Sequence, residues 1–242
     1  MYRYLIRPKG YLTTPKRLHQ LLGTQRIIRY GQQKRHQQPD WEKDFFLSYL
    51  SPPNETLNST QQYTQLHNFY CSNKRDQRQT IEDSGIRTPS SYPTHKFIVR
   101  PLHHYGGRDY RVTQDHHDFN PQSEYISNFF PKNSEYRIIF VKGQPLITLL
   151  KHAPEGVSNE LPWNHRNGGS FITVNNEKNN RLRHTSCLAD LLKFPIIQNA
   201  HLCAVDILYR RRQYAVLEIN FCPSITIQDN LERIREHVYP PN

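Results

Sequence analysis

The segment Tyr214–Ile225, YAVLEINFCPSI, places polar side chains inside what is otherwise a buried strand. Its β-branched and aromatic residues run up to Pro223, which ends the predicted strand. Glu218 and Asn220 stand two positions apart, and alternate side chains of a strand point to the same face, so both are predicted on one face of a sheet. Because an isolated ionised carboxylate is costly to bury, Glu218 requires a partner on that face.

A second carboxylate is predicted on the same face. Asp206 lies in the preceding strand, HLCAVDILY, and a short hairpin turn around residues 210–212 joins the two strands. Two carboxylates and an amide oxygen are the hard oxygen ligands that Mg²⁺ prefers when phosphates and water complete its octahedron. We therefore predict a Mg²⁺ site at Asp206, Glu218 and Asn220. The structural alternative is that Glu218 forms a salt bridge with a nearby arginine and Asp206 caps a turn.

The net charge of +11 indicates an anionic partner. The 242 residues contain 32 Lys and Arg against 21 Asp and Glu, which raises the local concentration of anions, whether ATP, nucleic acid or an acidic peptide. Charge identifies only this class of partner. A chain of this length buries roughly 70% of its unfolded surface, so we expect a folded core beneath a very polar surface.

Cysteine usage and hydropathy indicate the compartment. The four cysteines form no CxxC pair, and the start MYRYLIRPKG has no apolar segment of signal-peptide length. No window approaches the roughly 18 consecutive apolar residues that a membrane helix needs. We expect a soluble cytoplasmic protein with no membrane partner, whose thiols are buried rather than bridged.

The order of predicted elements indicates an α/β (α+β) fold. Residues 1–50 are predicted as strand, helix and strand, with the helix begun by Thr14 and Pro15. A polar stretch over about residues 31–62, interrupted by WEKDFFLSYL, predicts loops. Two helical segments follow, and Gly85 ends the second. The remainder is mostly strands, with one helix that ends near LADLLKF: KFIVRPL, YRVT, EYRIIFV and PLITLL around the hairpin turn KGQP, FITV, HLCAVDILY and QYAVLEINF.

A glycine loop follows a cationic strand in KFIVRPLHHYGGRDYRV. Arg100 stands on the strand, and Gly106 and Gly107 lie in the loop that returns into the next strand. Glycines let backbone N–H groups approach phosphates closely, and the cation neutralises them. Taken alone, YGG is more often only a hairpin turn, and the sequence contains neither GxGxxG nor GxxxxGK.

Residues 72–228 resemble the ATP-grasp superfamily through six motifs in the order of that family: NKRDQRQTIEDSGIRTP, FIVRP, HHYGGRD, EYI, EYRIIFVKGQPL and AVDILYRRRQYAVLEINFCPSI. The resemblance implies an ATP-grasp fold, in which two α+β subdomains grip ATP. The first subdomain, with the glycine loop, would span residues 72–123. The second, with the Mg²⁺-binding hairpin, would span residues 124–242. A reduced N-terminal α/β region would occupy residues 1–71.

The resemblance also implies roles for individual residues. Those that would bind ATP are Lys74 on the opening helix, Arg100, His104, Gly106 and Gly107 at the phosphates, the hinge Glu124, Tyr125 and Ile126 at the adenine edge, Glu135 near the ribose, and Asn164 in WNHRNGG. The catalytic residues at the acyl phosphate would be Arg137, Lys151 and Arg166. The metal ligands would be Asp206, Glu218 and Asn220, in agreement with the strand pattern.

Within the superfamily, the intermediate motifs are most similar to ligases that add amino acids to a peptide or protein carboxylate, such as the ribosomal-protein glutamate ligase. The implied reaction forms an acyl phosphate and ADP from a carboxylate and ATP, and an amine then displaces phosphate. The carboxylate and the amine are unidentified, and a peptide or another large anionic acceptor fits the charge. The sequence departs from the pattern at Arg100, where a lysine is usual, at the inserted Asn167, and at Ala204, where some relatives have an arginine.

Two other classes stay open. The departures at Arg100 and Ala204 favour a degenerate ATP-grasp protein that binds nucleotide without ligating. The net charge, with basic and aromatic residues interleaved as in YRRRQY, favours a nucleic-acid-binding module whose affinity would collapse as salt rises.

Overall fold

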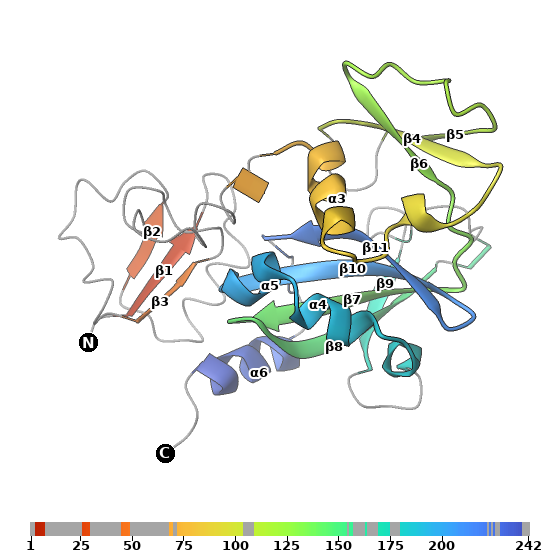
Figure 1. The fold of residues 1–242 in the computed structure, drawn as a ribbon. Coiled ribbons are helices and arrows are strands. Elements are labelled where there is room, and N and C mark those ends of the chain that lie inside the picture. Colours follow the sequence, from red (N-terminus) through yellow and green to blue (C-terminus); the bar gives the residue numbers. More distant parts are fainter. Residues whose placement is uncertain are drawn as a thin grey trace.

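The described part of the chain forms three β-sheets (Figure 1). The computed structural model describes residues 3–7, 26–29, 45–48, 68–69, 72–103, 109–153, 155–156, 163, 169–174, 180–221, 223, 225 and 228–238. The first sheet is parallel, with strand order β2-β1-β3: β1 (Arg3–Arg7), β2 (Arg26–Arg29) and β3 (Phe45–Ser48). Strands β1 and β2 match the predicted α/β start, and β3 comes from WEKDFFLSYL. The helix predicted from Thr14 lies outside the described residues.

Helix α3 (Lys74–Asp83) is capped at both ends, as its sequence predicts. The Asn73 side chain accepts a hydrogen bond of 3.0 Å from a first-turn backbone N–H. At the other end Gly85 has φ +76°, and the N–H of Ile86 donates to the carbonyl of Ile81 across this glycine. Both isoleucines are buried in the main core, which fixes the end of α3.

A second sheet contains the strand that carries Arg100. Its order is β5-β4-β6, with β4 (Phe97–Pro101) between β5 (Arg111–Thr113) and β6 (Glu124–Asn128), all antiparallel. The 3-10 turn η2 (Pro89–Ser91) leads into it. Because β6 pairs with β4, a subdomain boundary at residue 124 would divide this sheet. The chain instead passes to the next sheet after the end of β6.

The third sheet has five antiparallel strands in the order β11-β10-β7-β8-β9. It lies between α3, α4 (Cys187–Leu192) and α5 (Pro195–Asn199) on one side and α6 (Gln228–Val238) on the other (Figure 1). These strands are β7 (Ser134–Val141), β8 (Gln144–His152), β9 (Ser170–Thr173), β10 (Leu202–Arg210) and β11 (Gln213–Asn220). The predicted KGQP hairpin joins β7 to β8, with Lys142 at φ 48° and Gly143 at φ 74°. Such left-handed values suit the twist of a tight hairpin, and glycine adopts them at little cost.

Alternation along these strands separates an apolar face from a charged face. The apolar face, with Ile138, Val205 and Ile207, packs against residues of α3, η4 (Arg181–His184), α4 and α5. On the opposite face, α6 lies beside β9, where Thr173 and Asn230 form a hydrogen bond of 3.2 Å. The charged side chains of that face form the candidate site.

Two of the cysteines, Cys187 and Cys203, are buried in the core and unbridged, as predicted. Burial raises the pKa of both thiols, that of Cys203 to about 12. Cys71 and Cys222 lie outside the described residues.

None of the helices in the described part of the chain has the length and apolar character required to cross a membrane.

The β7–β8 turn provides a test of the fold. A Cβ at Gly143 would lie 2.9 Å from the carbonyl oxygen of Gln198, and φ is positive there. We expect Gly143→Ala to lower the free energy of unfolding by about 2–4 kcal/mol, from backbone strain plus the clash with α5. Gly85→Ala is the matched control, because its φ is also positive but nothing lies within 4 Å of its Cβ. Urea denaturation that gives equal losses for both variants would contradict this packing.

Candidate nucleotide and metal site

A β-bulge in the β10–β11 hairpin places two consecutive side chains on the charged face. Asp206 pairs with Glu218, but the next residue of β10, Ile207, pairs with Val216, so Leu217 is an extra residue in β11. A bulge leaves its extra residue unpaired and re-aims the side chain. Leu217 therefore lines a cleft, while Glu218 beside it stays opposite Asp206. Strand periodicity alone does not reveal this bulge.

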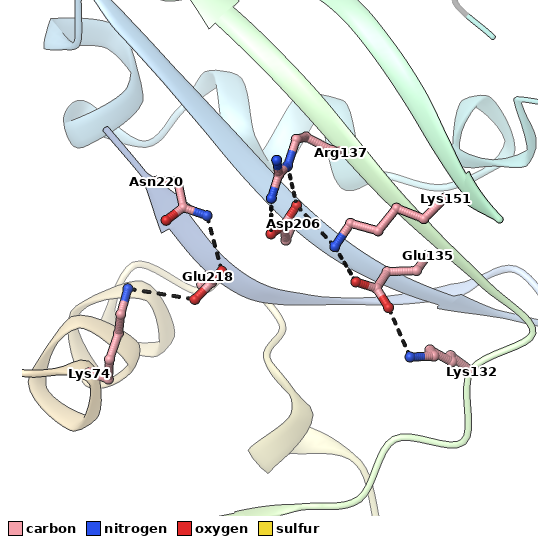
Figure 2. Close-up of polar contacts among 8 residues, drawn as sticks. All are labelled: Lys74, Lys132, Glu135, Arg137, Lys151, Asp206, Glu218 and Asn220. Carbon is pink, nitrogen blue, oxygen red and sulfur yellow. Dashed lines mark hydrogen bonds and ion pairs between the residues drawn. The ribbon is translucent and has the colours of Figure 1, made fainter. Parts of the chain in front are cut away.

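The three predicted metal ligands lie together (Figure 2). Asp206 and Glu218 are cross-strand neighbours, and Asn220 stands two residues beyond Glu218 on the same face. The Nδ2 of Asn220 donates a 3.0 Å hydrogen bond to Oε1 of Glu218, which leaves the amide oxygen as a possible ligand for a cation. The Nζ of Lys74, at the start of α3, lies 3.6 Å from Oε2 of Glu218. Glu218 thus has a lysine as its partner.

Arg137 holds Asp206 through both carboxylate oxygens. The Nε and Nη2 of Arg137 donate hydrogen bonds of 2.7 and 2.8 Å, and the Nζ of Lys151 lies 3.5 Å from Oδ1 (Figure 2). Asp206 is therefore paired across strands and does not cap a turn. Each carboxylate oxygen can accept at two positions, and the guanidinium fork takes one on each. Two carboxylates and an amide oxygen on one face fit a Mg²⁺ ion, which would share Asp206 with Arg137 or displace it.

A buried ion network extends from Asp206 toward β6. Glu135 lies between Lys151 and Lys132, with Lys132 Nζ 2.8 Å from its Oε2 (Figure 2). Burial alone raises the pKa of Glu135, but the ammonium groups of Lys151 and Lys132 outweigh it and hold that pKa below its ordinary value. Lys132 also lies 4.7 Å from the ring centre of Trp163. The sequence does not single out Lys132, because a lone lysine after a proline carries no periodic signal.

A cleft lies between the second and third sheets. Its apolar lining includes Ile98 from β4, Phe130 after β6, Leu208 from β10 and Leu217 from the bulge. Three charged side chains, Arg100, Lys132 and Glu135, also line it. Apolar walls with a few polar groups are typical of small-molecule sites. Arg100 and Glu135, both predicted beside a nucleotide, thus line the same cleft.

The predicted hinge residues lie next to this cleft and do not line it. Glu124 forms an ion pair with Arg111, Tyr125 is buried, and Ile126 is central in β6. The residues of this segment that line the cleft are Ser127, Asn128, Phe129 and Phe130. This segment therefore lines the cleft at the end of β6, a few residues beyond the predicted hinge.

Five predicted site residues, His104, Gly106, Gly107, Asn164 and Arg166, lie outside the described residues. Apart from the three hinge residues, the described ones converge on the cleft and on the charged face of the third sheet: Lys74, Arg100, Glu135, Arg137, Lys151, Asp206, Glu218 and Asn220.

No protein-family model and no curated protein matches the sequence. Solved structures match it in fold. The ATP-grasp ligase PsnB, complexed with a phosphomimetic variant of minimal precursor, Mg and ADP, has a TM-score of 0.57 at 10% identity over 98% of this chain and 97% of its own. The D-alanine–D-alanine ligase from Bacillus anthracis complexed with ATP has a TM-score of 0.54 at 13% identity over 98% and 96%. The macrocyclase MdnC bound with precursor peptide MdnA, from Microcystis aeruginosa MRC, has a TM-score of 0.55 at 10% identity over 100% of both chains. The chain has the ATP-grasp fold.

The ATP-grasp fold inferred from six ordered motifs, with its α+β class, is thus confirmed. At identities of 10% to 13% the likeness shows the fold alone. What the chain does with this fold depends on its own residues.

The buried position of Glu135 leads to a stability prediction. We expect Glu135→Gln to lower the free energy of unfolding at pH 7 by about 3–5 kcal/mol, because two buried ammonium groups lose their counter-charge. The folded pKa of Glu135 is depressed, so its contribution is complete above the unfolded pKa of about 4.3 and is lost as pH falls through the folded pKa. The gap between wild type and variant should therefore shrink below about pH 4.

The measurement is urea denaturation between pH 3.5 and 7. Glu124→Gln is the matched control: its pair with Arg111 is exposed and screened by solvent, so its loss should change the stability far less. If the two variants lose equal stability at pH 7, the buried network does not stabilise the fold as described.

Proposed function

We propose that the chain is an ATP-dependent ligase that joins a carboxylate to an amine and releases ADP and phosphate. The observation that carries this proposal is the excess of cations around the cleft and the charged face. The described cations there are Lys74, Arg78, Arg100, Lys132, Arg137 and Lys151, against the carboxylates Glu135, Asp206 and Glu218. Buried charge is costly unless it is paired. The excess of positive charge therefore favours a polyanionic ligand such as a nucleoside triphosphate.

The residues of the cleft divide into two groups by chemistry. The side chains of Ile98, Leu208 and Leu217 form apolar walls that suit a planar base. Arg100, on the lining, is the cation that would neutralise the phosphates, and Glu135 would accept hydrogen bonds from the ribose hydroxyls. Since the cleft adjoins the bulge, a base held there directs its phosphates toward Glu218.

The charged face would carry the reaction. Bound by Asp206, Glu218 and Asn220, Mg²⁺ would withdraw charge from the phosphate oxygens. Arg137 and Lys151 both lie within ion-pair distance of Asp206 and would neutralise the acyl phosphate formed when the substrate carboxylate attacks the γ-phosphate. The amine would then displace phosphate. In this scheme the side chains position groups and neutralise charge, and none of them forms a covalent intermediate.

We further propose a peptide as the acceptor. The net charge of +11 would attract an acidic chain. Two structures that share the fold support this choice: PsnB was solved with a minimal precursor, and MdnC with a precursor peptide.

Nucleotide binding without ligation is the second candidate. It is favoured by the position of Ala204, which pairs with Asn220 beside the metal site and offers no charge there. Nucleic-acid binding rests on net charge only.

The first test is calorimetric binding of ATP with and without Mg²⁺. We expect wild type to bind ATP in a Mg²⁺-dependent manner, and Glu218→Ala with Asn220→Ala to lose at least about tenfold in affinity, since two ligands are removed. Asp229→Ala with Glu236→Ala, two exposed positions on α6, is the control pair and should bind as wild type does. Equal binding by the site variant under Mg²⁺ would make Glu218 a structural ion-pair partner.

The second test separates the ligase from the nucleotide binder. Release of ADP that depends on both an added carboxylate peptide and an amine is the result expected of a ligase. Tight ATP binding with no such release across a panel of acidic peptides would favour the non-ligating protein. Salt-sensitive nucleic-acid binding that is unchanged in Glu218→Ala would favour neither.

A further inference from the structure

Arg78 is a buried cation to which neither the motifs nor the proposed reaction assigns a role. It lies on α3, one turn after Lys74, and its side chain is only 7% exposed. Residues four apart share a helix face, so both cations point toward β11. The neighbouring Arg75, by contrast, is exposed.

Few groups of the fold satisfy the Arg78 guanidinium. Its Nη2 donates to the backbone carbonyl of Leu217 at 3.5 Å, the limit of a hydrogen bond, and its plane lies 5.2 Å from the ring centre of Tyr125. Its Nε and Nη1 are buried and have no acceptor in the described part of the chain. A buried donor without an acceptor carries the full cost of its lost hydration.

Arg100 has the same deficiency. It is 8% exposed, and its Nε is also buried without an acceptor among the described residues. Arg100 is the cross-strand neighbour of Tyr125 in β4 and β6, and Arg78 lies over the Tyr125 ring, so both arginines are close to this residue. Burial lowers the pKa of Arg78, and the neighbouring charge of Arg100 lowers it further.

The nearby carboxylates do not accept hydrogen bonds from the unused donors of the two arginines. Glu218 and Glu82 both attract Arg78, but Glu218 is paired with Lys74, and Glu82 accepts a hydrogen bond from Thr88. Two buried like charges with at least three unused donors therefore require an anion that the described fold does not supply.

We propose that Arg78 and Arg100 form a two-guanidinium subsite for the polyphosphate of the nucleotide. In this subsite Arg78 raises the affinity for the phosphates and leaves the affinity for the nucleoside nearly unchanged. Two contacts place the subsite at the cleft: Arg100 lines it, and Arg78 bonds the carbonyl of Leu217, which also lines it. A guanidinium fork matches the oxygens of a phosphate, and a polyphosphate carries enough charge for two forks. This inference rests on the proposed nucleotide function.

A purely structural role for Arg78 makes a different prediction. If Arg78 serves to tie α3 to β11 and to Tyr125, its removal will lower the melting temperature. If the Arg78 donors are satisfied only by a bound phosphate, replacing Arg78 with an apolar residue removes unsatisfied donors. The ligand-free protein will then melt at the same or a higher temperature.

The test is Arg78→Leu in the full chain, with Arg75→Leu as the control that removes one charge from the exposed side of the same helix. ADP and adenosine are titrated by calorimetry, and melting of the ligand-free protein is followed by circular dichroism. We expect Arg78→Leu to weaken ADP binding about 10- to 100-fold, the loss of a charge-assisted contact, and adenosine binding less than about twofold. Arg78→Lys should fall between, because it keeps the charge and loses the fork.

Three outcomes would overturn the inference. Unchanged ADP affinity in Arg78→Leu would remove Arg78 from the subsite while leaving the nucleotide function in place. Equal losses for ADP and adenosine with a lower melting temperature would assign Arg78 a structural role. Failure of the unchanged protein to bind either ligand would overturn the proposed function and this inference with it.

Discussion

The candidate site depends first on the β10–β11 pair and its bulge, which place Asp206, Leu217 and Glu218. Strict alternation would send Leu217 into the apolar core and keep only Glu218 on the charged face. With one extra residue in β11, the same short stretch provides a wall of the cleft, a carboxylate for a cation, and a carbonyl that receives Arg78. The cleft and the charged face are thus adjacent because of a single backbone irregularity. The opposite face of the same strands, with Val205, is free to form the core that holds this irregularity in place.

Charge balance is the second organising feature. Lysine, arginine and carboxylate alternate from Lys132 through Glu135 and Lys151 to Asp206 and Arg137, so that each buried charge in this series has an opposite neighbour. Such pairs do not need to stabilise the fold in order to be retained. Cations in excess of this series stand at the edge of the cleft. A ligand that binds the folded state and neutralises them stabilises that state by mass action, so part of the stability of this protein is expected to depend on its ligand.

The sequence predicted those parts of the site that depend on local periodicity. Asp206, Glu218 and Asn220 share a face because they obey the alternation of a strand, and α3 ends near Gly85 because only a residue tolerant of positive φ suits that position. The missed features depend on tertiary contacts. Arg78 and Arg75 are indistinguishable in a helix rich in charge, and only the approach of β11 and Tyr125 buries one of them. Lys132 and the cleft-lining residues at the end of β6 were missed for the same reason, since the cleft they line exists only once two sheets are packed.

Arg137 connects the metal ligands to the phosphates in the proposed reaction. Without ligand its fork engages both oxygens of Asp206, and the same guanidinium is assigned to the acyl phosphate. The Arg137 guanidinium cannot donate the same pair of hydrogen bonds to Asp206 and to the acyl phosphate at once. A phosphate that draws Arg137 away exposes Asp206 to a cation, and a cation at Asp206 weakens the hold on Arg137. By linkage, each of the two ligands must then raise the affinity for the other by the same factor.

The ring centre of Phe171 in β9 lies 5.0 Å from the Arg137 guanidinium and 5.7 Å from Lys151 Nζ, so the ring stabilises both cations whichever anion they pair with. The ion pairs of the ligand-free face are therefore compatible with its proposed chemistry, because they hold the cations beside the position where phosphate charge would develop.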